Sequence, residues 1–332
     1  MYISKGKSKN YFIYYRQPNG KKTRKSTGSK TKKEALAYFS IWSKELKNRR
    51  PSNIISLGEL KKKFLASIEW NHTKGSYRHS RKCIERLIEC LGEGINVNDI
   101  TKQQVETFIN NIYKTSQHTA SLHLRHLKAI FNKAIDWNYL EKNPFKGIRL
   151  RIATNNPIFI SKDELKLIVE KELNPILSSI YTFAFYTGLR LSEITNLEWN
   201  DIDLNSRITS LKNKEGFTTK SKKERTIPIS NVVYDILINL NHNSNYVFTK
   251  DGLKFNATYV SKSFKKCVIA SNLNPKIHFH TLRHSFASNL VQRGANIYTI
   301  QKLLGHSNIS TTQIYSHLNQ GNLISAVDLL ND

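Results

Sequence analysis

The sequence contains few cysteines and no long apolar run. Cys83, Cys90 and Cys267 are the only cysteines in 332 residues, and no two of them form a CxxC pair. An odd number at these spacings indicates neither a disulfide framework nor a zinc site. No stretch approaches the roughly eighteen uninterrupted apolar residues that a membrane helix needs, and the opening MYISKGKSKNYFIYY does not resemble a secretory signal. We therefore expect a protein of a reducing compartment, the cytoplasm, with no membrane-spanning part.

Acidic residues are also scarce. The chain has 25 Asp and Glu against 52 Lys and Arg, which gives a formal net charge of +27 and a pI near 9.9. Residues 1–50 alone hold 15 basic and 2 acidic residues. Such an excess repels itself unless a polyanion binds it, and this favours nucleic acid as the partner. The alternatives are a basic surface that only maintains solubility, or one that lies on a membrane.

The first segment, residues 1–52, is predicted to be a separate basic module. The aromatic-rich run YFIYYRQ favours a β-strand, PNG at 18–20 is typical of a tight turn, and KKTRKSTG follows as a short basic run. The stretch KKEALAYFSIWSKEL then has helical spacing. A small sheet with one helix and this charge is suited to lie on DNA, with Arg24 and Lys25 as candidate contacts.

The second segment, residues 53–150, is predicted to be an all-helical domain. Four stretches carry apolar residues at steps of three and four, which is typical of amphipathic helices. The apolar positions are Leu57, Leu60, Phe64 and Ile68; Ile84, Leu87, Ile88 and Leu91; Val105, Phe108, Ile109 and Ile112; and Leu124, Leu127, Phe131 and Ala134. The candidate DNA contacts on the polar faces are Arg78, Arg81, Arg125 and Lys128.

The third segment, residues 155–332, is predicted to mix helices with short strands. Ser161 and Glu164 form a capping-box pattern that opens a helix. Further helices are expected at SSIYTFAFY, at about 257–271, at 281–292 and at 296–304. Residues 206–229 indicate short strands around a basic loop. The chain as a whole is therefore predicted to be mainly α, with small β-sheets.

Two stretches of the third segment carry cations suited to phosphate. In TGLRLSE, Arg190 follows a glycine turn, and a guanidinium grips two phosphate oxygens at once through its planar fork. In HTLRHSFASNL, His280 and Arg283 are three residues apart and share one side of a helix. Taken alone, Arg190 fits an ordinary surface arginine, and an HxxR pattern arises often by chance.

A third stretch, LGHSNISTTQIYSH, adds a histidine and a tyrosine. A glycine can end a helix before His306, and Tyr315 follows after a polar loop. A packing tyrosine usually lies in an apolar periodic pattern, whereas TTQIYSH is largely polar. We therefore expect Tyr315 to expose its phenol and to act chemically.

These three motifs, in this order, resemble the signature boxes of the tyrosine recombinase, or phage integrase, family. The resemblance covers residues 155 to about 320, and the helical second segment is similar to the family's SAM-like core-binding domain, including NPF at 143–145. It implies a helical core-binding domain followed by a mixed α+β catalytic domain. The basic module at 1–52 loosely resembles the arm-binding modules of lambda-like integrases.

The resemblance also implies a mechanism. Tyr315 would attack the scissile DNA phosphate, form a 3′-phosphotyrosyl link and release a 5′-hydroxyl. Arg190 and Arg283 would clamp the non-bridging oxygens as charge builds in the transition state. His280 would assist proton transfer, and His306 would donate a hydrogen bond to the phosphate.

The family uses one further residue, a lysine on a β-hairpin between the first two boxes, which protonates the leaving 5′-oxygen. In TKSKKERTIPI the best match is Lys220, and its neighbours Lys222 and Lys223 are candidate contacts to the DNA backbone. The resemblance implies no metal and no nucleotide cofactor, because the arginines and the lysine supply the charge. The phosphotyrosyl bond stores the energy for rejoining the strand.

The resemblance implies double-stranded DNA attachment sites as partners and a homotetramer on synapsed DNA, in the nucleoid-associated cytoplasm. Host DNA-bending and excision factors are candidate partners. The apolar stripe of the C-terminal tail would dock on a neighbouring subunit, or pack back on its own domain. That stripe comprises Leu323, Ile324, Val327 and Leu330.

Within this family, the basic module at 1–52 favours the integrase of a prophage or other mobile element. The alternatives are a housekeeping recombinase that resolves chromosome dimers, a type IB topoisomerase and a non-catalytic DNA-binding regulator. The apolar tail argues against the topoisomerase. The presence of all six matching residues argues against the regulator, in which at least one is expected to be lost.

Overall fold

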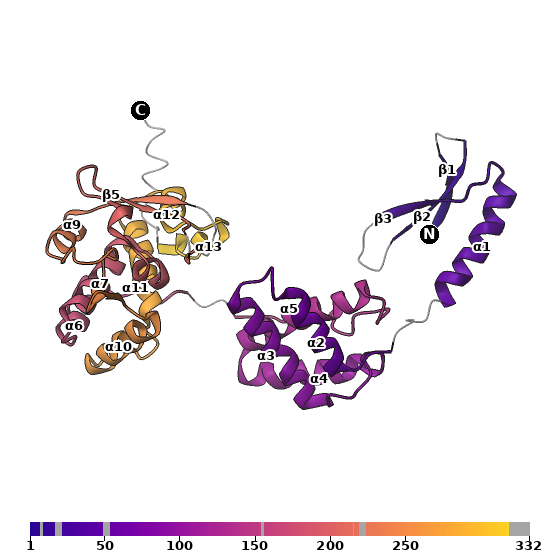
Figure 1. Cartoon of the computed structure of the whole chain (residues 1–332), viewed down its shortest axis with the longest axis horizontal. Coiled ribbons are helices and arrows are strands. Elements are labelled where there is room, and N and C mark those ends of the chain that lie inside the picture. The colour runs from indigo at the N-terminus through magenta and orange to yellow at the C-terminus, as the bar shows by residue number, and fades with distance from the viewer. Residues whose placement is uncertain are drawn as a thin grey trace. The chain divides into compact units, whose positions relative to one another are not determined.

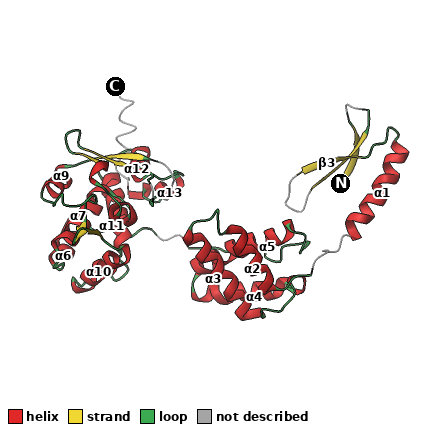
Figure 2. Ribbon diagram, viewed as in Figure 1, coloured by secondary structure: helices red, strands yellow, loops and turns green. Residues whose placement is uncertain are grey.

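The chain divides into two compact units, residues 1–154 and 155–332. The computed structural model describes residues 1–6, 9–16, 22–48, 54–153, 156–214, 216–218 and 224–318. These ranges are mainly helical with small sheets, which confirms the predicted fold class (Figure 2). Within them, no helix is both long enough and apolar enough to cross a membrane.

The first unit begins with a three-stranded antiparallel sheet and a helix (Figure 1). Its elements are β1 (Tyr2–Lys5), β2 (Tyr11–Arg16), β3 (Lys22–Ser26) and α1 (Lys32–Asn48). Strand β2 is central and buries Ile13, and the ring of Tyr15 packs edge-on against Trp42 of α1, with ring centroids 4.9 Å apart. Strand β1 was not predicted, because YISK lacks a clear alternating pattern.

The remainder of the first unit is a helical bundle, as the apolar spacing predicted. Its helices are α2 (Leu57–Ile68), α3 (Lys74–Leu91), α4 (Lys102–Thr115) and α5 (Gln117–Asp136), with a 3-10 turn η1 (Val97–Asp99) between α3 and α4. The predicted apolar positions Leu60, Leu87, Ile109 and Phe131 are fully or almost fully buried in one core. Each of the four α-helices starts at a Ser or Thr whose hydroxyl accepts a backbone N–H of the first turn.

The second unit surrounds one long buried helix. Its helices are α6 (Lys162–Glu170), α7 (Pro175–Thr187), α8 (Leu191–Thr195), α9 (Asn231–Ile238), α10 (Ala257–Ala270), α11 (Phe279–Gln292), α12 (Ile297–Leu304) and α13 (Ser310–Gln313), with 3-10 turns η2 (Trp199–Asp201) and η3 (Ser316–Leu318). Helix α7 contacts α6, α8, α9 and α11. Its apolar residues lie in the largest core of the unit, which is why SSIYTFAFY is apolar on nearly all sides.

Two small sheets complete the second unit. The first orders β4 (Ile202–Asp203), β5 (Ile208–Leu211) and β6 (Arg225–Pro228) as an antiparallel meander, and β6 contacts α12. The second pairs β7 (Thr249–Lys250) with β8 (Leu253–Lys254). The start of β6 therefore lies beside the end of α12, where the LGHSNISTTQIYSH motif begins.

Candidate active site

Arg283 joins the three sequence motifs into one site. Its side chain, 2% exposed, donates from Nη1 to the carbonyl of Gly188 at 2.7 Å and from Nη2 to the carbonyl of Leu304 at 2.5 Å. Gly188 ends α7 two residues before Arg190, and Leu304 ends α12 two residues before His306. One buried guanidinium thus fixes the positions of the chain segments that carry the other two boxes.

The turn at Gly188 tolerates no side chain. Gly188 has φ +65°, and a Cβ built on it would lie 2.4 Å from a ring carbon of Phe286. Both facts require glycine, because the left-handed conformation is strained for other residues and the space is filled. The predicted glycine turn before Arg190 is therefore confirmed, and it places Arg190 at the start of α8.

A buried carboxylate holds Arg190 and a second arginine. Glu193, 1% exposed, accepts Arg190 Nη1 at 3.0 Å, and Arg225 binds it with both terminal nitrogens at 3.0 and 2.7 Å. Burial alone raises the pKa of Glu193, but the hydrogen bonds and charges of Arg225 and Arg190 outweigh it and leave the pKa below its usual value. Arg225 Nε also donates to the carbonyl of Leu303, so this pair connects α8, β6 and α12.

Glu193 and Arg225 were not predicted from the sequence. The available signal was an acidic residue in the middle of a basic, partly apolar motif, because a buried carboxylate requires a buried cation nearby. The arginine that opens the strand RTIP supplies that cation. Neither residue follows from the spacing of the motifs themselves.

The site carries unbalanced positive charge. Three guanidinium groups, those of Arg190, Arg225 and Arg283, face the single carboxylate of Glu193. Burial, followed by the charge of Arg190, lowers the pKa of Arg283 to about 9. A site that keeps a buried arginine under such strain is suited to an anion, and a phosphate supplies the missing negative charge.

Three histidines line the same region. His306 Nδ1 bonds the hydroxyl of Thr312 at 3.0 Å, and burial followed by the charge of Arg283 lowers its pKa to about 4. His280 keeps an exposed surface, yet partial burial of its ring lowers its pKa to about 3, with smaller contributions from the nearby titratable groups of His284 and Arg283. At neutral pH both imidazoles are therefore uncharged. When His306 Nδ1 accepts from Thr312, its Nε2 carries the proton and can donate to an anion.

Tyr315 is buried, so the expectation of an exposed phenol was wrong. Only 1% of the residue is exposed, and it packs with Ala287, Val291, Ile300 and Leu304. The apparently polar run folds into α13 and the turn after it, and this turn directs Tyr315 inward beside the buried Thr312. Sequence polarity failed here because Thr312 meets its hydrogen-bonding need inside the protein.

The hydroxyl of Tyr315 bonds a residue that was not predicted, His284. The distance from the phenol oxygen to His284 Nδ1 is 2.6 Å. Burial raises the pKa of Tyr315 to about 12, although the charge of Arg283 opposes this rise. The phenol is therefore protonated at neutral pH. The signal that could have indicated His284 is its four-residue spacing from His280, which places both rings on one side of α11.

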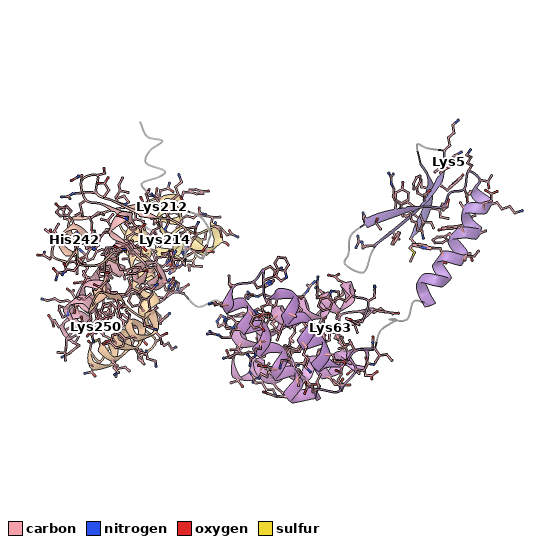
Figure 3. All side chains as sticks on the ribbon, in the orientation of Figure 1. Lys5, Lys63, Lys212, Lys214, His242 and Lys250 are labelled. Carbon is pink, nitrogen blue, oxygen red and sulfur yellow. The ribbon has the colours of Figure 1, made fainter. Side chains whose placement is uncertain are left out.

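The predicted general acid is a lysine of the basic loop before β6. Lys220, Lys222 and Lys223 lie outside the described residues. Of the nearby lysines that are described, both labelled in Figure 3, Lys214 forms ion pairs with Glu198 at 3.1 Å and Asp201 at 2.7 Å, whereas Lys212 is exposed. The two carboxylates hold Lys214 to η2, so it is a poor candidate for proton donation to DNA.

The candidate DNA contacts of the helical bundle differ in their surroundings. Arg78, Arg81 and Arg125 are exposed, and Arg81 pairs with Glu85 on its own helix. Lys128 donates to the carbonyl of Ile148 at 2.8 Å, which leaves two of its three N–H groups for another partner. Within the described ranges, no group of three or more His, Cys, Asp or Glu side chains is arranged to hold a metal ion.

The buried carboxylate gives the first prediction. Glu193→Gln is expected to lower the free energy of unfolding by about 3 kcal/mol, because it leaves the guanidinium of Arg225 buried without a counter-charge. Urea denaturation measures this change. Glu85→Gln is the matched control, since Glu85 also receives two cations, Lys61 at 2.9 Å and Arg81 at 3.0 Å, but near the surface. The control is expected to cost less than about 1 kcal/mol, and equal losses would contradict the account.

Comparison with known proteins follows the same division of the chain. The phage integrase family model matches residues 159–322, and the phage integrase SAM-like domain model matches residues 56–152. Tyrosine recombinase XerC of Escherichia coli is 33% identical over 221 residues, which cover 63% of this chain and 72% of that protein. A tyrosine recombinase XerC-like protein of Caldanaerobacter subterraneus is 29% identical and covers 96% of this chain and 94% of its own length.

Solved structures show the same fold. The Tn1549 transposon integrase in complex with transposon right end DNA superposes with a TM-score of 0.72 at 19% identity, covering 84% of this chain and all of that one. A lambda integrase tetramer bound to a Holliday junction gives a TM-score of 0.67 at 16% identity, covering 93% of this chain and 96% of that one. The family-model matches and the 33% identical relative show that the chain belongs to the tyrosine recombinase, or phage integrase, family of site-specific DNA recombinases.

Proposed function

We propose that this chain is the integrase of a prophage or other mobile element and that it cleaves and rejoins DNA through a 3′-phosphotyrosyl bond on Tyr315. The observation that carries the chemistry is the single cluster in which Arg283 ties together the segments bearing Arg190, His306 and Tyr315. This cluster has excess positive charge, a nucleophile and histidine donors, which phosphoryl transfer without a metal requires.

Each member of the cluster has a role that its geometry suits. Arg190 and Arg283 hold the non-bridging oxygens, and Glu193 holds the guanidinium of Arg190 through an ion pair. His306 donates through Nε2, because its Nδ1 is engaged with Thr312. His280, exposed at the start of α11, assists proton transfer. Lys220 remains the proposed donor to the leaving 5′-oxygen.

The N-terminal module supports the role in a mobile element. One face of its sheet packs against α1, and no other described element covers the opposite face, here called the open face. Tyr14 on the open face stacks on Tyr2 at 5.1 Å between ring centroids, and Arg24 lies over the ring of Phe12 at 5.0 Å. An open sheet face with aromatic and basic side chains can contact both the phosphates and the base edges of DNA. We propose that this face binds DNA sites separate from the crossover site.

The bundle and the catalytic unit would bind the crossover site itself. Arg78, Arg81, Arg125 and Lys128, with Lys222 and Lys223 of the basic loop, would contact phosphates, so binding should weaken steeply with salt. The solved relatives include a lambda integrase tetramer bound to a Holliday junction. By analogy we propose a tetramer on synapsed DNA with exchange of C-terminal tails, assisted by host DNA-bending and excision factors. The tail stripe lies outside the described residues.

A second candidate function is that of a housekeeping recombinase. The XerC-like relative aligns with 96% of this chain, so a recombinase described as XerC-like can have this length. A chromosomal recombinase of this kind needs only its crossover site. The two functions therefore differ in whether the N-terminal module binds DNA of its own.

DNA footprinting tests this difference when two neighbouring basic residues of the module, Arg24 and Lys25, are substituted one at a time. Arg24 lies on the open face, whereas Lys25 lies on the α1 side with its ammonium 5.3 Å from the ring of Trp42. On DNA flanking the gene, the wild-type chain is expected to protect a crossover site and additional distal sites. Arg24→Ala is expected to weaken only the distal sites and to reduce their log–log salt slope by about 0.9, while Lys25→Ala retains them. A single class of site, insensitive to both changes, would favour the housekeeping recombinase.

A further inference from the structure

The hydrogen bond between His284 and Tyr315 has no assigned role in the chemistry described above. His284 is half-buried on α11, directly after Arg283. Its Nδ1 lies 2.6 Å from the phenol oxygen, and its ring meets the ring of His280 edge-on, with centroids 4.9 Å apart and planes at 89°. The ring of His284 is therefore held between the nucleophile on one side and His280 on the other.

The direction of this hydrogen bond follows from the two protonation states. Burial lowers the pKa of His284 to about 4, and burial raises that of Tyr315 to about 12, so both groups are neutral at physiological pH. A neutral phenol donates, and the imidazole accepts at Nδ1 while Nε2 carries its proton. A length of 2.6 Å is at the short end for an O–H donor, which indicates a well-formed bond.

Because of the backbone, the hydrogen bond from Tyr315 to His284 also fixes the position of the phenol relative to Arg283. Arg283 and His284 are consecutive residues of one helix, and Arg283 also fixes Gly188 and Leu304. The clamp for the phosphate and the anchor for the phenol therefore move together as one rigid element. Tyr315 itself lies between α13 and η3, each of which is only a single short turn.

We propose that His284 is a positioning residue that holds the phenol oxygen of Tyr315 in register with the Arg283 clamp, so that the oxygen is aligned for attack on the bound phosphate. This inference rests on the proposed function. Transfer of the phenolic proton to His284 is strongly unfavourable in the resting site, because the phenol is a far weaker acid than the imidazolium. The proposed role is therefore alignment of the nucleophile and not its deprotonation.

Two substitutions separate this role from simple packing. His284→Leu fills similar space but offers no acceptor, whereas His284→Asn places an amide oxygen close to the position of Nδ1. Equal melting temperatures, within a few degrees, establish that both variants fold. The full-length chain is used throughout, with Tyr315→Phe to identify the relevant signals.

The first measurement needs no DNA. Tyrosine labelled with ¹³C at Cζ reports the environment of each phenol by NMR, and the signal missing from Tyr315→Phe belongs to Tyr315. This signal is expected to shift in His284→Leu and to stay near its wild-type position in His284→Asn. An unchanged signal in His284→Leu would show that the hydrogen bond is not formed in solution and would overturn the inference.

The second measurement compares DNA binding with single-turnover cleavage of a nicked duplex. His284→Leu is expected to bind with a Kd within about twofold of the wild type and to cleave roughly 100-fold more slowly, as a misplaced nucleophile does. His284→Asn is expected to cleave at least tenfold faster than His284→Leu. Cleavage by His284→Leu at the wild-type rate, or faster, would overturn the positioning role. A wild-type chain that forms no adduct would instead overturn the proposed function, and this role with it.

Discussion

Tyr315→Phe is expected to bind attachment-site DNA as tightly as the wild-type chain and to form no covalent adduct with it. The substitution removes only the phenol oxygen, which is the proposed nucleophile, while the ring keeps its contacts with Val291 and Leu304. Loss of the hydrogen bond to His284 is expected to lower the free energy of unfolding by about 1 kcal/mol. Denaturing gels of nicked duplexes measure the adduct, and mobility shifts measure binding.

The neighbouring Tyr298 provides the control for this prediction. It lies on α12 and is 63% exposed, and it undergoes the same change in Tyr298→Phe. This variant is expected to form the adduct at the wild-type rate, because its phenol is outside the Arg283 cluster. An adduct that survives in Tyr315→Phe and disappears in Tyr298→Phe would show that the nucleophile is Tyr298 and not Tyr315.

Arg283→Lys is expected to reduce the rate of strand cleavage by about 100- to 1,000-fold. Lysine keeps the positive charge but lacks the planar fork, so it cannot hold Gly188 O and Leu304 O while also binding a phosphate. The same loss is expected to destabilise the fold by about 1–3 kcal/mol, because one buried carbonyl is left without a partner. Single-turnover cleavage and urea denaturation separate the two effects.

Arg293→Lys is the matched control for Arg283→Lys. Arg293 follows the same helix, α11, but is exposed to solvent. Cleavage by this variant is expected to stay within about twofold of the wild type, because surface substitutions away from special features rarely matter. If Arg283→Lys cleaved DNA as fast as Arg293→Lys, the buried guanidinium would have no role in phosphate binding.

The regular elements could be predicted wherever burial produces a period. Leu60, Leu87, Ile109 and Phe131 face one core, so their helices show three- and four-residue steps in the sequence. Helix α9 escaped prediction for the same physical reason. Its sequence NVVYDILI is apolar on several sides and rich in β-branched residues, which leaves no clear period and resembles a strand.

The candidate site was predictable only as far as its residues carry motifs. Arg190, Arg283 and Tyr315 lie in three recognisable boxes, but nothing in those boxes shows that Arg283 uses two donors to hold the boxes together. Glu193 and Arg225 are 32 residues apart in the sequence, and only the fold brings them into contact. Long-range pairs of this kind follow from tertiary structure and leave no local pattern.

The burial of Tyr315 shows how a polar run can mislead. Thr312 and Tyr315 are polar by composition, yet both meet their hydrogen-bonding needs inside the protein, with His306 and His284. Buried polar groups are acceptable when they are paired, and the partners here come from other motifs. The sequence pattern therefore pointed to Tyr315 but misjudged its environment, and its role as the nucleophile stays a prediction.

Mapping the covalent adduct shows directly whether Tyr315 forms the bond with DNA. Wild-type chain would be incubated with nicked duplexes tiled across the DNA that flanks the gene, and the trapped adduct would be digested and analysed by mass spectrometry. We expect one modified peptide, carrying a nucleotide on the Tyr315 oxygen through a 3′-phosphate. A nucleotide on any other residue, or sequence-specific binding with no adduct on any duplex, would contradict it.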